Sequence, residues 1–249
     1  MLALGCLALG CGRRDSAERE LLVFAAASLT DAFTEIARAF EGEHAGVTVK
    51  LSFGGSQALR MQIENGAEPQ VYASANHDHV QALQDQGRVR PPVSFTRNRL
   101  VVVVPEDNPT RIERFADLPR AERLVLCDEN VPAGAYTRQS LARAAKELGP
   151  DFARRVEAKV VSRESNVRQT LQKVVLGEAD AAVVYASDAV AGGEAVTTID
   201  IPDAYDITAT YSVAILQEVE RLELAKAFVA TLRSEAGQAI LSRHGFSAP

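Results

Sequence analysis

The chain has 249 residues, of which 47% are hydrophobic and 24% are charged. This balance is that of a folded globular protein, and it excludes a disordered chain or one that crosses a membrane many times. There are 27 Lys and Arg against 33 Asp and Glu, a net charge of −6, and no basic run is longer than a pair such as Arg13-Arg14. Nucleic-acid binding depends on clustered basic side chains, so no nucleic acid partner is expected.

Residues 1–20 are predicted to form a signal or lipoprotein segment with a polar tether. The apolar start ends in Ala8-Leu9-Gly10 before Cys11, which resembles a lipoprotein signal whose lipid would be carried by Cys11. The alternative is a short buried helix. After Glu20 no run approaches the roughly 20 apolar residues of a membrane span, so a lipid anchor at Cys11 is the expected membrane attachment.

From Leu21 short β-rich runs alternate with amphipathic segments, a pattern typical of α/β architecture. A buried strand is predicted over 21–25. In the following helix, over 29–40, apolar residues recur at the three- and four-residue spacing of one helical face. The remaining elements of this first block are strands over 47–53 and 71–73 and helices over 57–64 and 77–86.

A second block begins with a fully buried strand over 98–105. Its other predicted elements are strands over 123–127, 159–161, 181–185, 195–201 and 211–216, helices over 133–148 and 167–175, and two terminal helices around 222–232 and 239–241. No linker rich in Ser, Gly or Pro separates the blocks, which predicts two lobes joined by continuous strands. Lobe 1 would comprise residues 21–97 and 213–249, and lobe 2 residues 98–212.

Three predicted strand-to-helix junctions place small or hydroxyl-bearing residues before a helix. Ser28 with Asp31 fits a capping box, Ser56 fits an N-cap, and Pro132 would leave the amide of Ala133 free in a first turn. Free amides and the helix dipole attract anions, and such helix starts lie at the ligand crevice of open α/β sheets. The junctions predict an anion site without Lys or Arg, unless each serine only caps its own helix.

Together these segments resemble the molybdate-binding proteins of ABC importers, a family with the type II periplasmic-binding-protein fold. The resemblance runs from about Leu22 to Phe246. Its motifs are Val23-Phe24-Ala25-Ala26-Ala27-Ser28-Leu29-Thr30, Ser52-Phe53 with Ser56, Val131-Pro132-Ala133-Gly134, Asn166-Val167-Arg168, Val184-Tyr185-Ala186-Ser187-Asp188-Ala189 and Gly245-Phe246. It implies two α/β lobes of mainly parallel sheets flanked by helices, with the ligand cleft between them.

The resemblance also implies a site for a tetrahedral oxyanion, shared by both lobes. Its ligand-binding groups would be the hydroxyls and amides of Ser28 and Ser56, the amides of Ala133 and Val167, and the hydroxyl of Tyr185. Molybdenum would enter only as the oxyanion, without direct protein–metal bonds. The implied function is extracytoplasmic capture of molybdate, and of tungstate, for the membrane permease of an ABC importer. A periplasmic monomer without enzymatic activity or cofactor is expected.

Four residues outside these motifs, Gln70, Cys127, His77 and His79, are not among the expected ligand-binding residues. Gln70 stands where the family usually has an acidic residue. Cys127 is expected to be a buried, inert thiol. His77 and His79, two positions apart on a predicted helix, point to different faces and do not favour a metal site.

A site made of donors alone favours fully deprotonated dianions, because the O–H of hydrogen phosphate would find no acceptor. Sulfate, molybdate and tungstate all satisfy this condition, so a receptor for another oxyanion such as sulfate stays an alternative.

Hydrolysis by Ser28 or Ser56 is disfavoured, because there is no Gly-x-Ser-x-Gly motif and no histidine next to either serine. Arg168 should project away from the amide of Val167, so no charged clamp for an organic anion is expected. Capture should close the lobes about crossing strands near Asn98 and Ser212.

Overall fold

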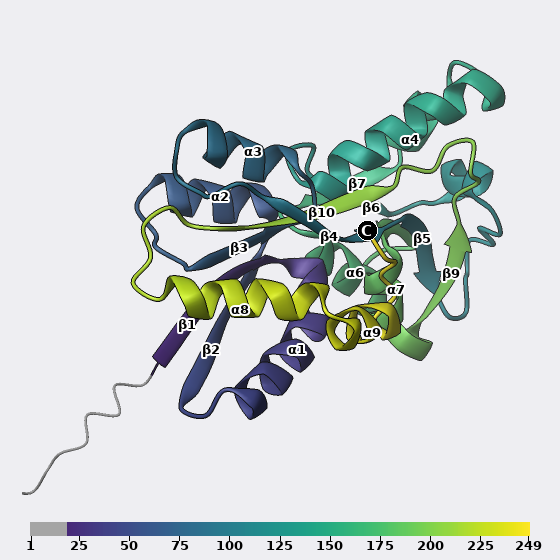
Figure 1. Ribbon diagram of the computed structural model, residues 1–249. Coiled ribbons are helices and arrows are strands. Elements are labelled where there is room, and N and C mark those ends of the chain that lie inside the picture. The colour runs from purple at the N-terminus through teal and green to yellow at the C-terminus, as the bar shows by residue number, and fades with distance from the viewer. Residues whose placement is uncertain (1–18) are drawn as a thin grey trace, which may run out of the picture.

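The structure is a computed structural model that describes residues 19–249, and it contains two five-stranded sheets (Figure 1). The predicted lipid-bearing Cys11 lies outside the described residues. The strands of the first sheet are β1 (Arg19–Ala26), β2 (Val47–Gly54), β3 (Val71–Ser74), β4 (Val93–Asn98) and β10 (Ala209–Ile215). Those of the second are β5 (Leu100–Pro105), β6 (Leu124–Cys127), β7 (Val160–Glu164), β8 (Ala181–Tyr185) and β9 (Val196–Asp200).

The two sheets have the same plan, with orders β2-β1-β3-β10-β4 and β7-β6-β8-β5-β9. In the first, β1 pairs in parallel with β2 and β3, whereas β10 is antiparallel to β3 and β4. In the second, β6 is parallel to β7 and β8, and β5 is antiparallel to β8 and β9. The two-lobed α/β fold is therefore confirmed, but both sheets are mixed rather than mainly parallel. The strands that carry the chain between the sheets supply the antiparallel pairings.

The chain passes between the sheets twice. β4 ends at Asn98 and β5 begins at Leu100, so the first crossing is at Arg99. The second crossing spans residues 201–208, between β9 and β10. Asn98 thus lies beside a crossing, whereas Ser212 lies inside β10. The lobe boundaries and the closing motion stay predictions.

Helices cover the sheets. Those of the first lobe are α1 (Thr30–Glu43), α2 (Ser56–Glu64), α3 (Asp78–Asp85), α8 (Leu222–Arg233) and α9 (Glu235–Arg243). Those of the second are α4 (Pro132–Leu148), α5 (Phe152–Glu157), α6 (Val167–Val175) and α7 (Ala186–Gly192). There are also three short 3-10 turns, η1 (Ala27–Leu29) in the first lobe and η2 (Phe115–Arg120) and η3 (Gly193–Ala195) in the second. The six-residue α5 and seven-residue α7 were not predicted, because so few turns show no clear periodicity.

The C-terminal helices return to the first lobe, as Figure 1 shows for α8 and α9 beside α1. The ring of Phe228 on α8 lies edge-on to Phe33 and Phe40 of α1, with centroids 6.1 and 5.3 Å apart. All three side chains are fully buried, and burying a large apolar side chain contributes about 1.5–3 kcal/mol. This aromatic cluster fixes the C-terminal segment to the lobe built first.

The surroundings of Gln70 and Cys127 show what these two residues do in the fold. The side-chain oxygen Oε1 of Gln70 accepts the backbone N–H of Leu22 at 2.6 Å, so an amide does there what a carboxylate would do. Cys127 is buried, and burial raises the pKa of its thiol to about 12. A protonated thiol is a poor nucleophile, which agrees with the inert role expected for Cys127.

Within residues 19–249, no helix is both long and apolar enough to span a membrane.

Candidate functional site

A small cavity lies between the lobes, where parallel strands of both sheets end. Its lining residues end or follow β1, β2 and β3 in the first lobe and β6, β7 and β8 in the second. They are Ala26, Ala27, Ser28, Gly54, Gly55, Ser56, Ala75, Val131, Pro132, Ala133, Asn166, Val167 and Tyr185. The cavity is small, with a volume of about 10 Å³ or room for roughly one water molecule, so only a small ligand would fit. The structure thus brings all five predicted site residues together.

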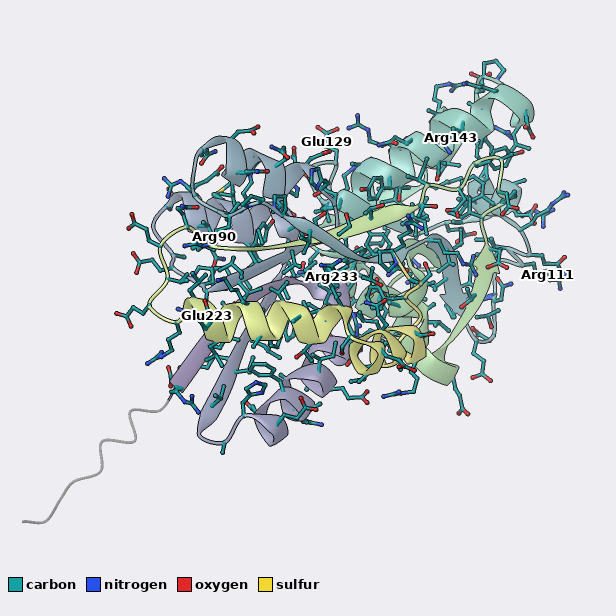
Figure 2. The ribbon with its side chains drawn as sticks, in the orientation of Figure 1. Arg90, Arg111, Glu129, Arg143, Glu223 and Arg233 are labelled. Atoms are coloured by element: carbon teal, nitrogen blue, oxygen red, sulfur yellow. The ribbon has the colours of Figure 1, made fainter. Side chains whose placement is uncertain are left out.

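None of these lining residues has a charged side chain. Charged side chains such as Arg111, Arg143 and Glu223 instead lie on the outside of the molecule (Figure 2). Any anion in the cavity would therefore be held by hydroxyls, amides and helix dipoles rather than by a cation.

Ser28 lies in η1, directly after β1, with its hydroxyl buried. The predicted capping box is wrong, because the N-cap of α1 is Leu29 and no side chain caps that helix. The Oγ of Ser28 instead lies 2.8 Å from the hydroxyl oxygen of Tyr211. A phenol is the more acidic of the two hydroxyls, so Tyr211 is the better donor. With Tyr211 donating, the proton of Ser28 stays available to a ligand.

Ser56 is the first residue of α2, and the N-cap is Gly55, so the predicted N-cap role of Ser56 is wrong as well. Its Oγ accepts the backbone N–H of Ala75 at 3.1 Å. Its carbonyl oxygen accepts the hydroxyl of Tyr72 at 2.8 Å. The side-chain oxygen is therefore engaged as an acceptor while its proton is left to donate. The capping alternative fails for both serines.

The second lobe contributes two helix starts. Ala133 follows Pro132 in the first turn of α4, as predicted, and Val167 is the first residue of α6. Amides in the first turn have no acceptor within their own helix, and the positive end of the helix dipole adds to their attraction for an anion. A Cβ on Gly134 would lie 2.0 Å from the carbonyl oxygen of Asp128, so this glycine permits the close approach that positions α4.

Tyr185 ends β8 and is fully buried beside the cavity. Within residues 19–249, its hydroxyl has no hydrogen-bond partner. Burial raises the pKa of this phenol well above its ordinary value, which keeps the proton on the oxygen. An unpaired buried hydroxyl costs about 1–3 kcal/mol, a cost that an acceptor in the cavity would remove.

Sequence reasoning missed Tyr211, which does not line the cavity but contacts the lining residue Ser28 through its hydroxyl. Its ring packs edge-on against Phe246 at 5.4 Å and against Tyr185 at 5.8 Å. A single tyrosine in a predicted strand carries no signal of this role. The one available clue was the Gly245-Phe246 motif, whose aromatic ring completes the packing.

The structure gives a catalytic serine little support. In the described part of the chain, the serine that a histidine contacts is Ser212, whose Oγ lies 3.1 Å from Nδ1 of His77. Ser212 does not line the cavity. Over the same residues there is no group of three or more His, Cys, Asp or Glu that could hold a metal ion.

The lobes touch beside the cavity. Nε2 of Gln57 on α2 donates to the carbonyl oxygen of Ser165, just before α6, at 2.9 Å. Arg168 does not line the cavity, and it reaches across to Asp31 on α1. The structure is therefore in a closed arrangement.

Known proteins resemble the chain over nearly its whole length. A family model described as bacterial extracellular solute-binding protein matches residues 21–247. The molybdate-binding protein ModA of Mycobacterium tuberculosis is 35% identical over 258 residues, which cover 100% of this chain and 95% of that protein. ModA of Escherichia coli is 32% identical over 244 residues, covering 92% of this chain and 90% of that protein.

Two solved structures show the same fold equally well. The periplasmic molybdate-binding protein of Azotobacter vinelandii gives a TM-score of 0.81 at 20% identity, covering 92% of this chain and 99% of that one. The sulfate-binding protein SubI of M. tuberculosis also gives 0.81, at 19% identity, covering 92% and 86%. The fold by itself therefore does not distinguish a molybdate site from a sulfate site.

Proposed function

Because the chain belongs to the family of bacterial extracellular solute-binding proteins, we propose that it captures molybdate, and tungstate, for the membrane permease of an ABC importer. The relatives named molybdate-binding protein, at 35% and 32% identity, support this ligand. The role is binding and delivery rather than catalysis. The protein would act as a periplasmic or extracytoplasmic monomer, with Cys11 as its lipid anchor.

The observation that carries the proposal is the buried hydroxyl of Tyr185, which lines the cavity and has no partner among the described residues. The free protons of Ser28 and Ser56 and the first-turn amides of Ala133 and Val167 face the same space. A tetrahedral dianion presents only acceptors, so its oxygens match such a set of donors. Each hydrogen bond to a charged group contributes about 1.5–3 kcal/mol. Several together allow sub-micromolar affinity, about 8 kcal/mol or more.

The same donors select against protonated anions. No carboxylate lines the cavity, so the O–H of hydrogen phosphate would be left without a strong acceptor there, at a cost of about 1–3 kcal/mol. Sulfate is the second candidate, because it carries no proton and the sulfate-binding SubI shares the fold. The sequence relationship to molybdate-binding proteins favours the larger oxyanions.

Calorimetric titration of the full chain with molybdate, tungstate, sulfate and phosphate tests the proposal. We expect tight binding of molybdate and tungstate and much weaker binding of the other two. Preference for sulfate would retain the oxyanion site and replace the ligand. Absence of binding by all four anions would refute the proposed function.

A further inference from the structure

Arg168 makes ion pairs with carboxylates of both lobes. Its side chain is 22% exposed and belongs to α6 of the second lobe. Nη2 lies 2.7 Å from Oδ2 of Asp31 on α1, and Nε lies 2.7 Å from Oδ1 of Asp188 on α7. These atoms are not aligned as hydrogen bonds, so both contacts are ion pairs. Nη2 also lies 3.5 Å from the carbonyl oxygen of Ser28.

Each member of this ion-pair group adjoins a residue of the cavity. Arg168 directly follows Val167, whose amide faces the cavity. Asp31 is in the first turn of α1, three residues after Ser28. Asp188 accepts the backbone N–H of Tyr185 with Oδ2 at 3.2 Å. The ion pairs therefore connect the backbone at one donor of the first lobe with two donors of the second.

The two ion pairs differ in what happens when the lobes separate. Arg168 and Asp188 belong to the same lobe, and the Asp188 side chain is completely buried, so this pair persists in an open form. Asp31 belongs to the other lobe and its side chain is 45% exposed, so opening breaks its contact and water solvates it. Because Asp188 already orients the guanidinium, less side-chain entropy is lost when Asp31 binds to it.

We propose that the ion pair between Asp31 and Arg168 is an interlobe clasp, outside the ligand cavity, that slows release of the bound oxyanion by stabilising the closed form. The ligand part of this inference rests on the proposed function. Closure itself is a property of the two lobes and can be measured separately. Asp31 and Arg168 are positioning residues, because neither lines the cavity.

The kinetic test uses Asp31→Asn, which removes the charge and keeps the shape of an exposed side chain. Stopped-flow displacement of molybdate should show dissociation about 3- to 10-fold faster than in the wild type, the range expected of a partly buried ion pair. The association rate should change little. The matched control is Glu35→Gln on the same helix, because Glu35 pairs with Arg243 and His244 within the first lobe. An unchanged dissociation rate in Asp31→Asn would overturn the clasp while leaving the proposed function intact.

The distance test does not depend on ligand identity. Spin labels at Met61 on α2 and at Leu176, directly after α6, report the separation of the lobes in the full chain with Cys6 and Cys11 replaced by serine. The two labelled residues are 59% and 67% exposed. In pulsed-dipolar measurements without ligand, Asp31→Asn should shift the distances toward the open form, and Glu35→Gln should not. Identical distributions in Asp31→Asn and the parent protein would refute the clasp, even if no oxyanion bound to the wild type.

Discussion

The hydroxyl of Ser28 lies 2.8 Å from that of Tyr211, a residue 183 positions further along the chain. The contact fixes the rotamer of a serine in η1, the turn that follows β1, from a strand that returns from the other sheet. It also determines which hydroxyl proton remains free. The geometry of the cavity therefore depends on residues that do not line it.

Tyr211→Phe tests this support. The variant keeps the ring that packs against Phe246, so the thermal unfolding midpoint should change little. The hydroxyl of Ser28 loses its donor and becomes free to rotate, and we expect the Kd for molybdate to rise about 3- to 10-fold, or about 0.7–1.4 kcal/mol. Tyr205→Phe is the control, because the Tyr205 hydroxyl binds Glu147 on the second lobe. Calorimetry that gave the same Kd for Tyr211→Phe and wild type would contradict the assignment.

Tyr185→Phe should affect stability and affinity in opposite directions. Without ligand, the variant no longer buries an unpaired hydroxyl, so its free energy of unfolding should rise by about 1 kcal/mol. With ligand, it lacks one donor to the dianion, so the Kd should rise about 10- to 100-fold. Urea unfolding and calorimetry on the same preparation measure both quantities. A variant that was less stable without ligand would show that the hydroxyl has a structural partner.

Much of this site was predictable from sequence, because its residues sit at strand ends, and strand ends follow from local hydrophobic patterns. Pro132 before Ala133 predicted the start of α4, because the fixed φ of proline suits the first turn of a helix. The roles of the two serines were not predictable locally. A serine before a helix fits an N-cap, but the partners that override capping are Tyr211 and Ala75, which long-range folding brings close.

The mixed sheets illustrate the same limit. Parallel pairing follows from alternating strands and helices, as in β1, β2 and β3. The strands β5 and β10 are also mostly buried, but they enter from the other sheet and pair antiparallel. Hydrophobicity along a strand does not record the direction of its neighbours, so β5 and β10 could be located but not oriented. The strand β4 was not predicted at all.

Gly55→Ala should weaken binding by obstructing closure. A Cβ at Gly55 would lie 2.4 Å from the carbonyl oxygen of Ser165 in the other lobe, and 2.5 Å from the side chain of Gln57. The backbone of Gly55 is extended, with φ −63° and ψ 136°, so alanine causes no backbone strain, and within lobe 1 only the flexible side chain of Gln57 has to move. We expect a Kd at least about 10-fold higher, a cost of about 1.4 kcal/mol or more, with an unchanged unfolding midpoint without ligand.

The neighbouring Gly54→Ala is the matched control for Gly55→Ala. Its Cβ would meet the side chain of Leu59 at 3.4 Å, an ordinary contact within lobe 1. Small-angle scattering with saturating molybdate should then show compaction for Gly54→Ala and a more open average for Gly55→Ala. Equal compaction in the two variants would contradict the prediction, because it would mean that the backbone around Gly55 or Ser165 shifts to make room for the methyl group.

Two buried aspartates of the second lobe have opposite pKa shifts. Burial raises the pKa of Asp188 to about 6, against the opposing effects of Arg168 and the backbone N–H of Tyr185. Burial also acts to raise the pKa of Asp180, but hydrogen bonds from the side chain and backbone of Arg123 outweigh it, and the pKa is lowered. The difference follows from exposure and bonding: Asp188 is completely enclosed, whereas Asp180 accepts several aligned N–H groups.

This contrast predicts how stability depends on pH. Between about pH 4 and 6 the folded protein holds a proton on Asp188 that the unfolded chain has released, so this group lowers the free energy of unfolding as the pH rises. Asp188→Asn cannot ionise, and urea unfolding at pH 4, 5, 6 and 7 should show the wild type losing stability relative to it up to about pH 6 and not beyond. Asp180→Asn should differ from the wild type by a nearly constant amount from pH 5 to pH 7, because Asp180 is ionised in both the folded and the unfolded state there. A constant difference for Asp188→Asn as well would mean that Arg168 keeps Asp188 charged throughout.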